Sequence, residues 1–223
     1  MTDSLKDVPA VAWQPEMSRP RDDAAPNRRQ QLLEAAAETF MEHGYSGASI
    51  DDIADRLGAT KGRVYHYYRS KLDILLDINI SILEHMTNGV APVADDGSSA
   101  AARLDRMVRL HALSVIYNMP AAQVALHTVL DSFSNQKQME AISRINQLRR
   151  DYEEAFLRVI EEGEHDGDFS VADSQLAAKA ALGALNWITV WYRAPGAGRD
   201  SPEAVAGALA QFVLRGLGCQ YEA

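Results

Sequence analysis

The sequence predicts an all-α protein of about nine helices, with a small N-terminal helix-turn-helix domain before a larger helical domain. Apolar residues recur at intervals of three and four along most of the chain from residue 27, which is the spacing of one helix face. No convincing strand-like run and no internal repeat occurs. At 223 residues, 47% of them hydrophobic, the chain can bury the cores of both domains.

Residues 1–26 are expected to form a flexible arm, because they contain four prolines and little periodicity. The arginines of this arm could reach a DNA minor groove. Asp22 and Asp23 lie among them, so a solubilising tail is the favoured interpretation. The first helix is expected to begin at Asn27 and to end at Gly44, with one apolar stripe that packs against the next two helices.

The next two helices are short and are separated by a tight turn. Ser49 precedes two aspartates and can cap a helix over 50–57, while Gly58 can adopt the left-handed conformation that ends it. Thr60 can then cap a second helix from Lys61 to about Tyr67, in which Val64 is the clearly aliphatic residue. Two short helices joined through a glycine-bearing turn indicate a helix-turn-helix.

Positive charge is concentrated at this motif. Residues 58–71 contain four cations and no acid, although the formal net charge of the chain is −9. Such a patch suits a polyanion, because each phosphate that a cation neutralises releases counterions. The hydroxyls of Tyr65 and Tyr67 add possible hydrogen bonds to a phosphate backbone. The segment therefore predicts contact with double-stranded DNA.

The run from Ile53 to Lys71, with Leu57-Gly58 and Thr60-Lys61-Gly62-Arg63-Val64-Tyr65-His66-Tyr67-Tyr68, resembles the TetR family of bacterial regulators. One departure is Tyr67-Tyr68 where histidine-phenylalanine is common, so a buried Tyr68 hydroxyl would need a partner. The resemblance implies a DNA-binding domain at 27–87, with its motif at about 50–69. It also implies that the DNA-facing residues are Ser49, Thr60, Lys61, Gly62, Arg63, Tyr65, His66, Tyr67 and Lys71.

Within that set, Lys71 is expected to grip a phosphate. Arg63 is the candidate for direct readout, since a guanidinium matches the O6 and N7 acceptors of guanine in the major groove. A phosphate contact alone is an equally open interpretation of Arg63, because most protein–DNA hydrogen bonds go to phosphate and sugar.

The remainder of the chain, residues 88–223, is expected to form a helical effector-binding and dimerisation domain. A helix over about 70–87 leads out of the motif, and the Gly, Pro, Asp and Ser content of 88–99 predicts a linker. Helical patterns then cover about 100–118, 121–134, 138–163, 172–192 and 201–218, with Asn118, Asp173 and Ser201 as candidate caps.

The last two helices are predicted to form a homodimer interface. Small residues that allow close approach and aromatic residues that bury large areas share their faces: Ala177, Ala180, Ala184, Trp187, Trp191, Val205, Leu209 and Phe212. The alternative is that these faces pack only within one subunit. A two-fold dimer predicts an inverted-repeat operator with half-sites about one helical turn apart, or a related spacing.

An effector pocket is expected inside the large domain, with an apolar lining and a few polar groups. The candidates are Met86, Leu113, Tyr117, Met119, Leu126, Phe133 and Phe156, with His111, Asn118 and His127 as polar handles. Each of these residues also suits an ordinary core. The segment Asn186-Trp187 to Gly196 is similar to TetR-type regulators of lipid and steroid breakdown, which implies an acyl-CoA or related effector. A lipophilic drug-like or aromatic ligand, or a protein partner, is the alternative.

Catalysis, cofactors and metals have little support in the sequence. Residues 196–201 begin like a dinucleotide loop but lack its third glycine and follow a helix. The acidic residues at 161–168 lack the spacing of a calcium loop, and His127 with Asp131 supplies only two metal ligands. No P-loop or zinc-protease motif occurs. An enzyme on a helical scaffold remains a distant alternative, since a triad assembled from distant residues would leave no motif.

The location is predicted to be cytoplasmic, without a membrane partner. No apolar run approaches the roughly 18 residues that a membrane span needs, and the N-terminus lacks the blocks of a signal peptide. The single Cys219 excludes an intramolecular disulfide. Combined with these features, the resemblance to the TetR family implies a cytoplasmic, ligand-responsive DNA-binding repressor.

Overall fold

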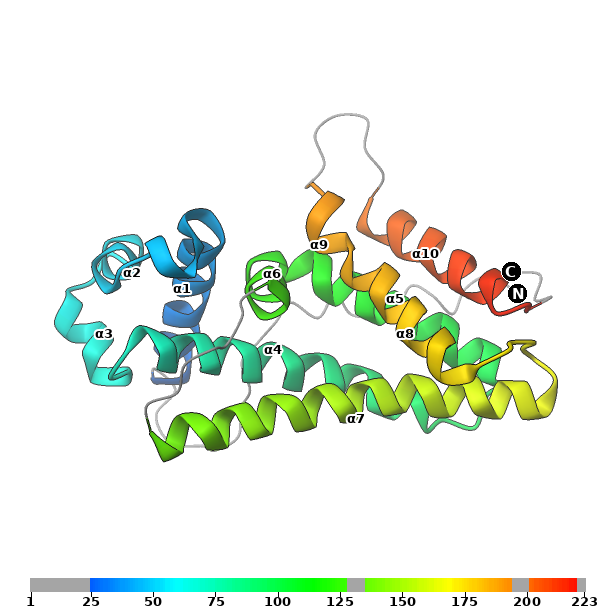
Figure 1. The fold of residues 1–223 in the computed structure, drawn as a ribbon. Coiled ribbons are helices and arrows are strands. Elements are labelled where there is room, and N and C mark those ends of the chain that lie inside the picture. The colour runs from blue at the N-terminus through cyan, green and yellow to red at the C-terminus, as the bar shows by residue number, and fades with distance from the viewer. Residues whose placement is uncertain (1–24, 128–134, 194–200, 220–223) are drawn as a thin grey trace.

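The computed structural model describes residues 25–127, 135–193 and 201–219, and these ranges form ten helical segments and no strand (Figure 1). The all-α class is therefore confirmed. Most of the predicted arm and Phe133 lie outside the described residues. None of the helices in the described ranges has the combination of length and apolar character that crossing a membrane requires.

A small domain at one end of the molecule consists of α1 (Ala25–Gly47), α2 (Ile50–Arg56) and α3 (Lys61–Tyr67) (Figure 1). The predicted stripe of α1 is buried, including Leu32, Leu33 and Phe40. At Gly44 the backbone adopts φ 71°, which interrupts the helix where the sequence predicts its end. One further turn continues to Gly47.

The predicted linker at 88–99 is partly wrong, because α4 (Lys71–Ala94) continues through its first half. The apolar stripe persists there, with Met86, Val90 and Ala94 buried at intervals of four. The Arg103 Nη1 atom donates to the Ala94 carbonyl oxygen at 2.8 Å, which satisfies a free acceptor at the end of the helix. Burial and capping therefore outweigh the loop-like composition of this segment.

The larger domain contains α5 (Ala100–Tyr117), α6 (Met119–His127), α7 (Gln136–Asp166), α8 (Ser174–Asn186), α9 (Ile188–Trp191) and α10 (Pro202–Gly216). Asp173 and Ser201 cap α8 and α10 as predicted. Asn118 instead lies at the end of α5, where its side chain donates to the Ser114 carbonyl oxygen. The predicted helix at 172–192 is divided at Trp187 into α8 and the single turn of α9.

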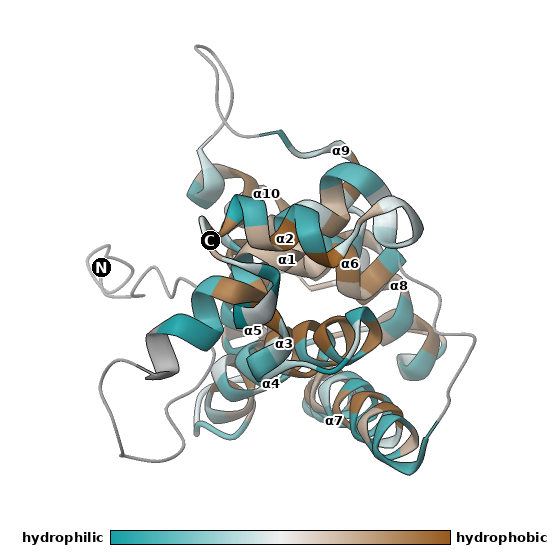
Figure 2. Ribbon diagram, turned by 90° about the vertical axis from the view of Figure 1, so that its left-hand side faces the viewer, coloured by the Kyte–Doolittle hydropathy of each residue, from teal (hydrophilic) through white to brown (hydrophobic). Residues whose placement is uncertain are grey.

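The helices enclose one continuous hydrophobic core that extends from the small domain into the large one. α4 packs along α7, and α10 packs along α5. Viewed from the end that carries α3, the hydrophobic residues lie on the helix faces that turn toward one another (Figure 2). α4 and α6 both pack against α1, so these two helices connect the domains.

Candidate functional site

Local signals position the two helices of the motif. The Ser49 Oγ atom accepts from the Asp52 backbone N–H at 3.1 Å, and the Asp52 carboxylate accepts from the Ser49 backbone N–H at 2.8 Å. Gly58 has the predicted left-handed conformation, with φ 62°. Thr60 occupies the position before α3, but its side chain makes no capping hydrogen bond. Val64 is fully buried and anchors α3 against the domain.

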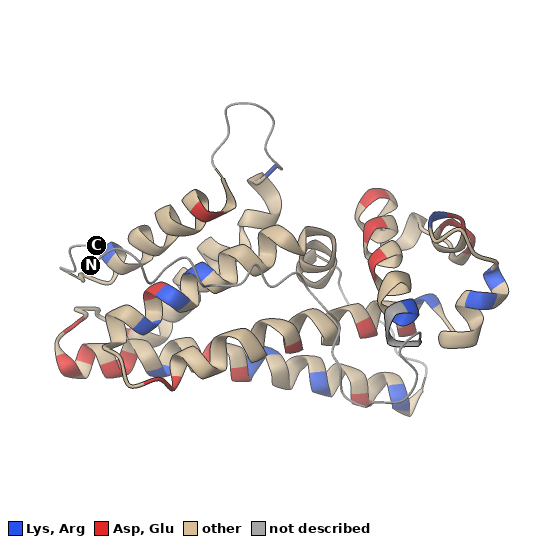
Figure 3. Ribbon diagram, turned by 180° about the vertical axis from the view of Figure 1, so that it is seen from behind, with Lys and Arg blue, Asp and Glu red and all other residues tan. Residues whose placement is uncertain are grey.

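The outward face of α3 is polar and positively charged. Lys61, Gly62, Arg63, Tyr65 and His66 are all exposed, as is Thr60 before them, whereas Tyr67 is half-buried. Lys61 pairs with Asp51 of α2 at 2.7 Å, and this hydrogen bond raises the pKa of Lys61. Arg63 has no hydrogen bond or ion pair to any residue that the structure describes. Lys and Arg residues lie along the ribbon at this outer end of the molecule (Figure 3).

Lys71 is directed into the domain, which differs from the predicted phosphate contact. Its Nζ atom donates to the carbonyl oxygens of Tyr45 at 2.5 Å, Ala48 at 2.6 Å and Ser46 at 3.3 Å. The same atom lies 4.6 Å from the centroid of the Tyr45 ring. Free carbonyls at the end of α1 are the natural acceptors of a cation, because helix ends carry partial negative charge. Lys71 thus fastens α4 to the end of α1.

The extra hydroxyl of Tyr68 has the partner that burial requires. Tyr68 is 8% exposed, and its hydroxyl donates to Asp77 of α4. The Arg29 Nη2 atom of α1 donates to the same carboxylate at 2.6 Å. Burial and the neighbouring Asp77 charge raise the pKa of Tyr68, so the phenol stays protonated. These three side chains join α1, α4 and the end of α3.

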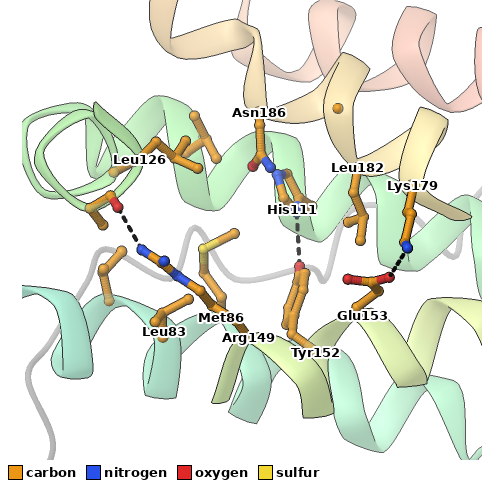
Figure 4. Close-up of a pocket in the computed structure, with 15 residues that line it drawn as sticks. Leu83, Met86, His111, Leu126, Arg149, Tyr152, Glu153, Lys179, Leu182 and Asn186 are labelled. Carbon is orange, nitrogen blue, oxygen red and sulfur yellow. Dashed lines mark hydrogen bonds and ion pairs between the residues drawn. The ribbon is translucent and has the colours of Figure 1, made fainter. Parts of the chain in front are cut away.

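A cavity of about 340 Å³ lies within the large domain (Figure 4). Five helices contribute to it, and its lining is mainly apolar. The lining residues are Ile82, Leu83, Met86, His111, Val115, Ala122, Ala125, Leu126, Arg149, Tyr152, Glu153, Lys179, Leu182, Gly183 and Asn186. The volume and the lining are those of a site for a small organic molecule.

Two buried polar side chains meet in the lining. The His111 Nδ1 atom of α5 and the Tyr152 hydroxyl of α7 are 2.9 Å apart, and these residues are 2% and 6% exposed. The Asn186 side chain of α8 lies beside the imidazole (Figure 4). Burial lowers the pKa of His111 to about 4, because desolvation disfavours the charged ring. His111 is therefore neutral at physiological pH.

The charged residues of the lining extend to the surface. Arg149 is exposed, and its Nη2 atom donates to the Ala125 carbonyl oxygen at 2.9 Å. Lys179 of α8 and Glu153 of α7 form an ion pair at 3.8 Å, with side chains 55% and 41% exposed. The cavity thus combines an apolar wall, a neutral polar pair and charges near solvent.

The structure brings three of the ten predicted effector residues, Met86, His111 and Leu126, into the lining. Phe156 is fully buried and packs behind it, with its ring centroid 5.4 Å from that of Tyr152. The predicted residues that lie away from the cavity are Leu113, Tyr117, Asn118, Met119 and His127.

The neighbours of those residues explain the differences. The Tyr117 hydroxyl donates to Glu203 of α10 at 2.6 Å, and the His127 Nε2 atom lies 2.9 Å from the Thr189 hydroxyl. Five polar lining residues are not among the predicted effector residues: Arg149, Tyr152, Glu153, Lys179 and Asn186. A signal existed for Tyr152, because it interrupts the aliphatic stripe of α7 at an interval of four from Phe156.

The predicted dimer residues divide into two groups. Trp187, Trp191 and Phe212 are 59%, 45% and 65% exposed, and Ala180 is also exposed. Leu176 of α8, which is not among the predicted dimer residues, is 65% exposed. Val205 is buried within the subunit core, whereas Ala177, Ala184 and Leu209 are half-buried. α8, α9 and α10 therefore present large apolar side chains to solvent in the single chain, which is typical of an interaction surface.

Known proteins match both domains. Residues 32–78 match the tetR family of bacterial regulatory proteins. Residues 97–217 match the tetracyclin repressor-like C-terminal domain. The HTH-type transcriptional repressor KstR2 of Rhodococcus jostii is 29% identical over 202 residues, which cover 89% of this chain and 96% of KstR2.

Solved structures share the fold. PfmR, a TetR family transcriptional regulator from Thermus thermophilus, is 32% identical with a TM-score of 0.71, over 83% of this chain and 98% of its own. AibR, solved in complex with isovaleryl coenzyme A and operator DNA, is 22% identical with a TM-score of 0.70 over 83% of this chain and 97% of its own.

Proposed function

The chain belongs to the TetR family of DNA-binding transcriptional regulators, and on this premise we propose that it is a repressor released from an inverted-repeat operator by a small hydrophobic effector. The family and the relatives are regulators, not enzymes. Residues 27–87 act as the DNA-binding domain and the residues from 88 onward as the effector and dimerisation domain. α4 spans the boundary between them.

The observation that carries this proposal is that two helices serve both domains. α4 and α6 line the cavity and also pack against α1 of the DNA-binding domain. A ligand that favours one arrangement of α4 and α6 therefore changes how α1, and with it α3, is held. Operator and effector then compete, because each prefers a different spacing of the two DNA-binding domains.

An acyl-CoA is the favoured effector. The apolar wall and the volume of about 340 Å³ suit an acyl group but leave the nucleotide outside. Arg149 and Lys179 at the exposed edge of the cavity offer cations to its phosphates. The shared fold with AibR, which was solved with isovaleryl coenzyme A, agrees with this class. A lipophilic or aromatic effector without CoA would use the same wall and would not need those cations.

A homodimer formed by α8 and α10 completes the proposal. The exposed side chains of Trp187 and Phe212 would bury most of their area in a four-helix, two-fold interface. We expect Phe212→Asp to produce monomers by sedimentation and to abolish tight operator binding. A fully dimeric variant that keeps its affinity would contradict this surface.

The function is tested by selecting bound sequences from random duplex DNA and then titrating the bound operator with acyl-CoAs. An inverted repeat that is released by an acyl-CoA supports the proposal. If the selection yields no motif, the proposed operator recognition is rejected. If no acyl-CoA releases the operator, the acyl-CoA effector is rejected.

A variant pair links release to the cavity. Gly183 lines the cavity, and a Cβ atom there meets nothing within 4 Å, so Gly183→Leu should fill the site without disturbing the fold. Gly89→Leu is the matched control, because Gly89 is also an unobstructed helical glycine but lies outside the lining. We expect both variants to bind the operator and only Gly183→Leu to resist release. If the effector released both variants from the operator equally well, the cavity would not be the effector site.

A further inference from the structure

We propose that the cavity recognises a neutral carbonyl group of its ligand through His111 and Tyr152, and that it selects a thioester or ketone over the corresponding carboxylate. This inference rests on the proposed function, which it deepens by naming the chemical group that is read. It concerns the buried polar pair and not the charged residues at the edge of the cavity.

The His111–Tyr152 pair has one more hydrogen than its mutual contact uses. A neutral imidazole carries one N–H and a phenol carries one O–H, and the contact of 2.9 Å between Nδ1 and the hydroxyl uses one of these two hydrogens. If the phenol donates to Nδ1, then the Nε2–H of His111 is left as a donor. If Nδ1–H donates to the phenol, then the O–H of Tyr152 is left. In both arrangements one buried donor remains.

The nearest protein partner for that remaining donor is the Asn186 side chain. A hydrogen bond with Asn186 acts to raise the pKa of His111 against the larger effect of burial, yet His111 Nε2 makes no hydrogen bond of good geometry to any described residue (Figure 4). Buried donors without acceptors are rare and unfavourable. The residues that hold the pair are lining residues of the cavity, so a ligand oxygen can accept the hydrogen there.

The surroundings of the pair favour an uncharged oxygen. α4 contributes Ile82, Leu83 and Met86 to the lining, and α6 contributes only apolar side chains. His111 is neutral, as is the neighbouring Asn186. A carboxylate placed at the pair would lose its hydration without gaining a cation, whereas a carbonyl needs only one donor.

The charged lining residues are already engaged elsewhere. Lys179 is paired with Glu153, and Arg149 donates to the Ala125 carbonyl oxygen. Arg149 and Lys179 are exposed residues, and the Glu153 side chain is 41% exposed. The two cations suit the anionic part of a larger ligand that emerges from the cavity, while the acyl carbonyl lies inside.

The test uses full-length protein and probes that lack CoA. Butanoyl, hexanoyl and octanoyl thioesters of N-acetylcysteamine are compared by calorimetry at pH 7.5 with the methyl ketones and the carboxylates of the same chain length. We expect both carbonyl series to bind at least tenfold more tightly than the carboxylates. Tighter binding of the thioesters than of the ketones identifies a thioester ligand, and the reverse order identifies a ketone. Carboxylates that bind as tightly as the carbonyl probes, or carbonyl probes that do not bind, overturn the inference.

Two variants locate the donor. Tyr152→Phe removes it if the phenol faces the ligand, and His111→Phe removes it if Nε2–H does, so at least one variant should lose the preference for carbonyl probes. Tyr117→Phe is the control, because Tyr117 lies outside the cavity. Melting temperature and operator binding report whether each variant folds. If both variants fold and keep the preference, the inference fails.

The two proposals fail separately. Carbonyl preference without operator release would remove the proposed function but leave the recognition of a neutral group intact. Operator release by acyl-CoA without carbonyl preference would support the proposed function and reject the recognition of a neutral carbonyl group.

Discussion

Replacement of Lys71 by methionine distinguishes an internal fastening from a DNA contact. The Lys71 ammonium donates to the carbonyl oxygens of Tyr45 at 2.5 Å and Ala48 at 2.6 Å, and both acceptors are partly buried. The bond to the Ser46 carbonyl is longer and exposed, so its contribution is small. At about 1.5 kcal/mol net for each of two bonds from a charged donor, the variant should lose about 3 kcal/mol of unfolding free energy. For a chain of this size that is a fall in melting temperature of roughly 6–12 °C.

The assay combines thermal unfolding with the salt dependence of operator binding. A residue that neutralises a phosphate contributes about 0.9 to the slope of log affinity against log salt. We expect Lys71→Met to keep the wild-type slope and to lose stability. The control is Lys61→Met at the exposed start of α3, which should reduce the slope and leave the melting temperature unchanged. A Lys71→Met variant with an unchanged melting temperature and a reduced slope would refute the fastening role and restore the phosphate contact.

Three further predictions concern single side chains. Arg63→Ala should lose about 1–3 kcal/mol of discrimination at one base pair, measured on operators substituted one position at a time; an equal loss on every sequence would make Arg63 a phosphate contact. Tyr68→Phe should lower the free energy of urea unfolding by about 1.5–3 kcal/mol, because Asp77 loses a hydrogen-bond donor. Tyr65→Phe on the exposed face should leave this free energy unchanged. Equal unfolding free energies for the two variants would show that the Tyr68–Asp77 bond does not stabilise the fold. The pKa of His111 is about 4 in the folded state against 6.5 for an unperturbed histidine, so the unfolded state binds the proton first and stability should fall as pH drops from about 6.5 toward 4. His111→Gln should flatten the dependence of the urea midpoint on pH between about 6.5 and 4. An identical dependence in variant and wild type would contradict the lowered pKa of His111.

We expect the hydrogen bonds of Lys71 to make the helix-turn-helix domain rigid. Lys71 binds α4 to the end of α1, and Asp77 binds α4 to both Arg29 and Tyr68. Movement of α4 by a ligand would therefore carry the whole domain with it and would not distort α3 separately. A change in the spacing of two rigid domains is the kind of two-state response that the proposed repressor requires.

Residues close together in the chain determined what the sequence could predict. The cap at Ser49, the left-handed turn at Gly58 and the apolar periodicity of α1 are interactions within a few positions, so the helix-turn-helix and the all-α class follow from the sequence alone. The exposed face of α3 is predictable for the same reason, because one buried residue, Val64, sets the rotation of the helix.

Only the tertiary structure decided which side chains share a space. The cavity collects residues from five helices between positions 82 and 186, and its composition depends on how those helices cross, which no local pattern encodes. Tyr117 and His127 suit a pocket by composition, but their neighbours in the structure are Glu203 and Thr189. Val205 has the composition of an interface residue, but its position on α10 buries it against its own subunit. The chain thus specifies its helices by short-range chemistry and its cavity by long-range packing.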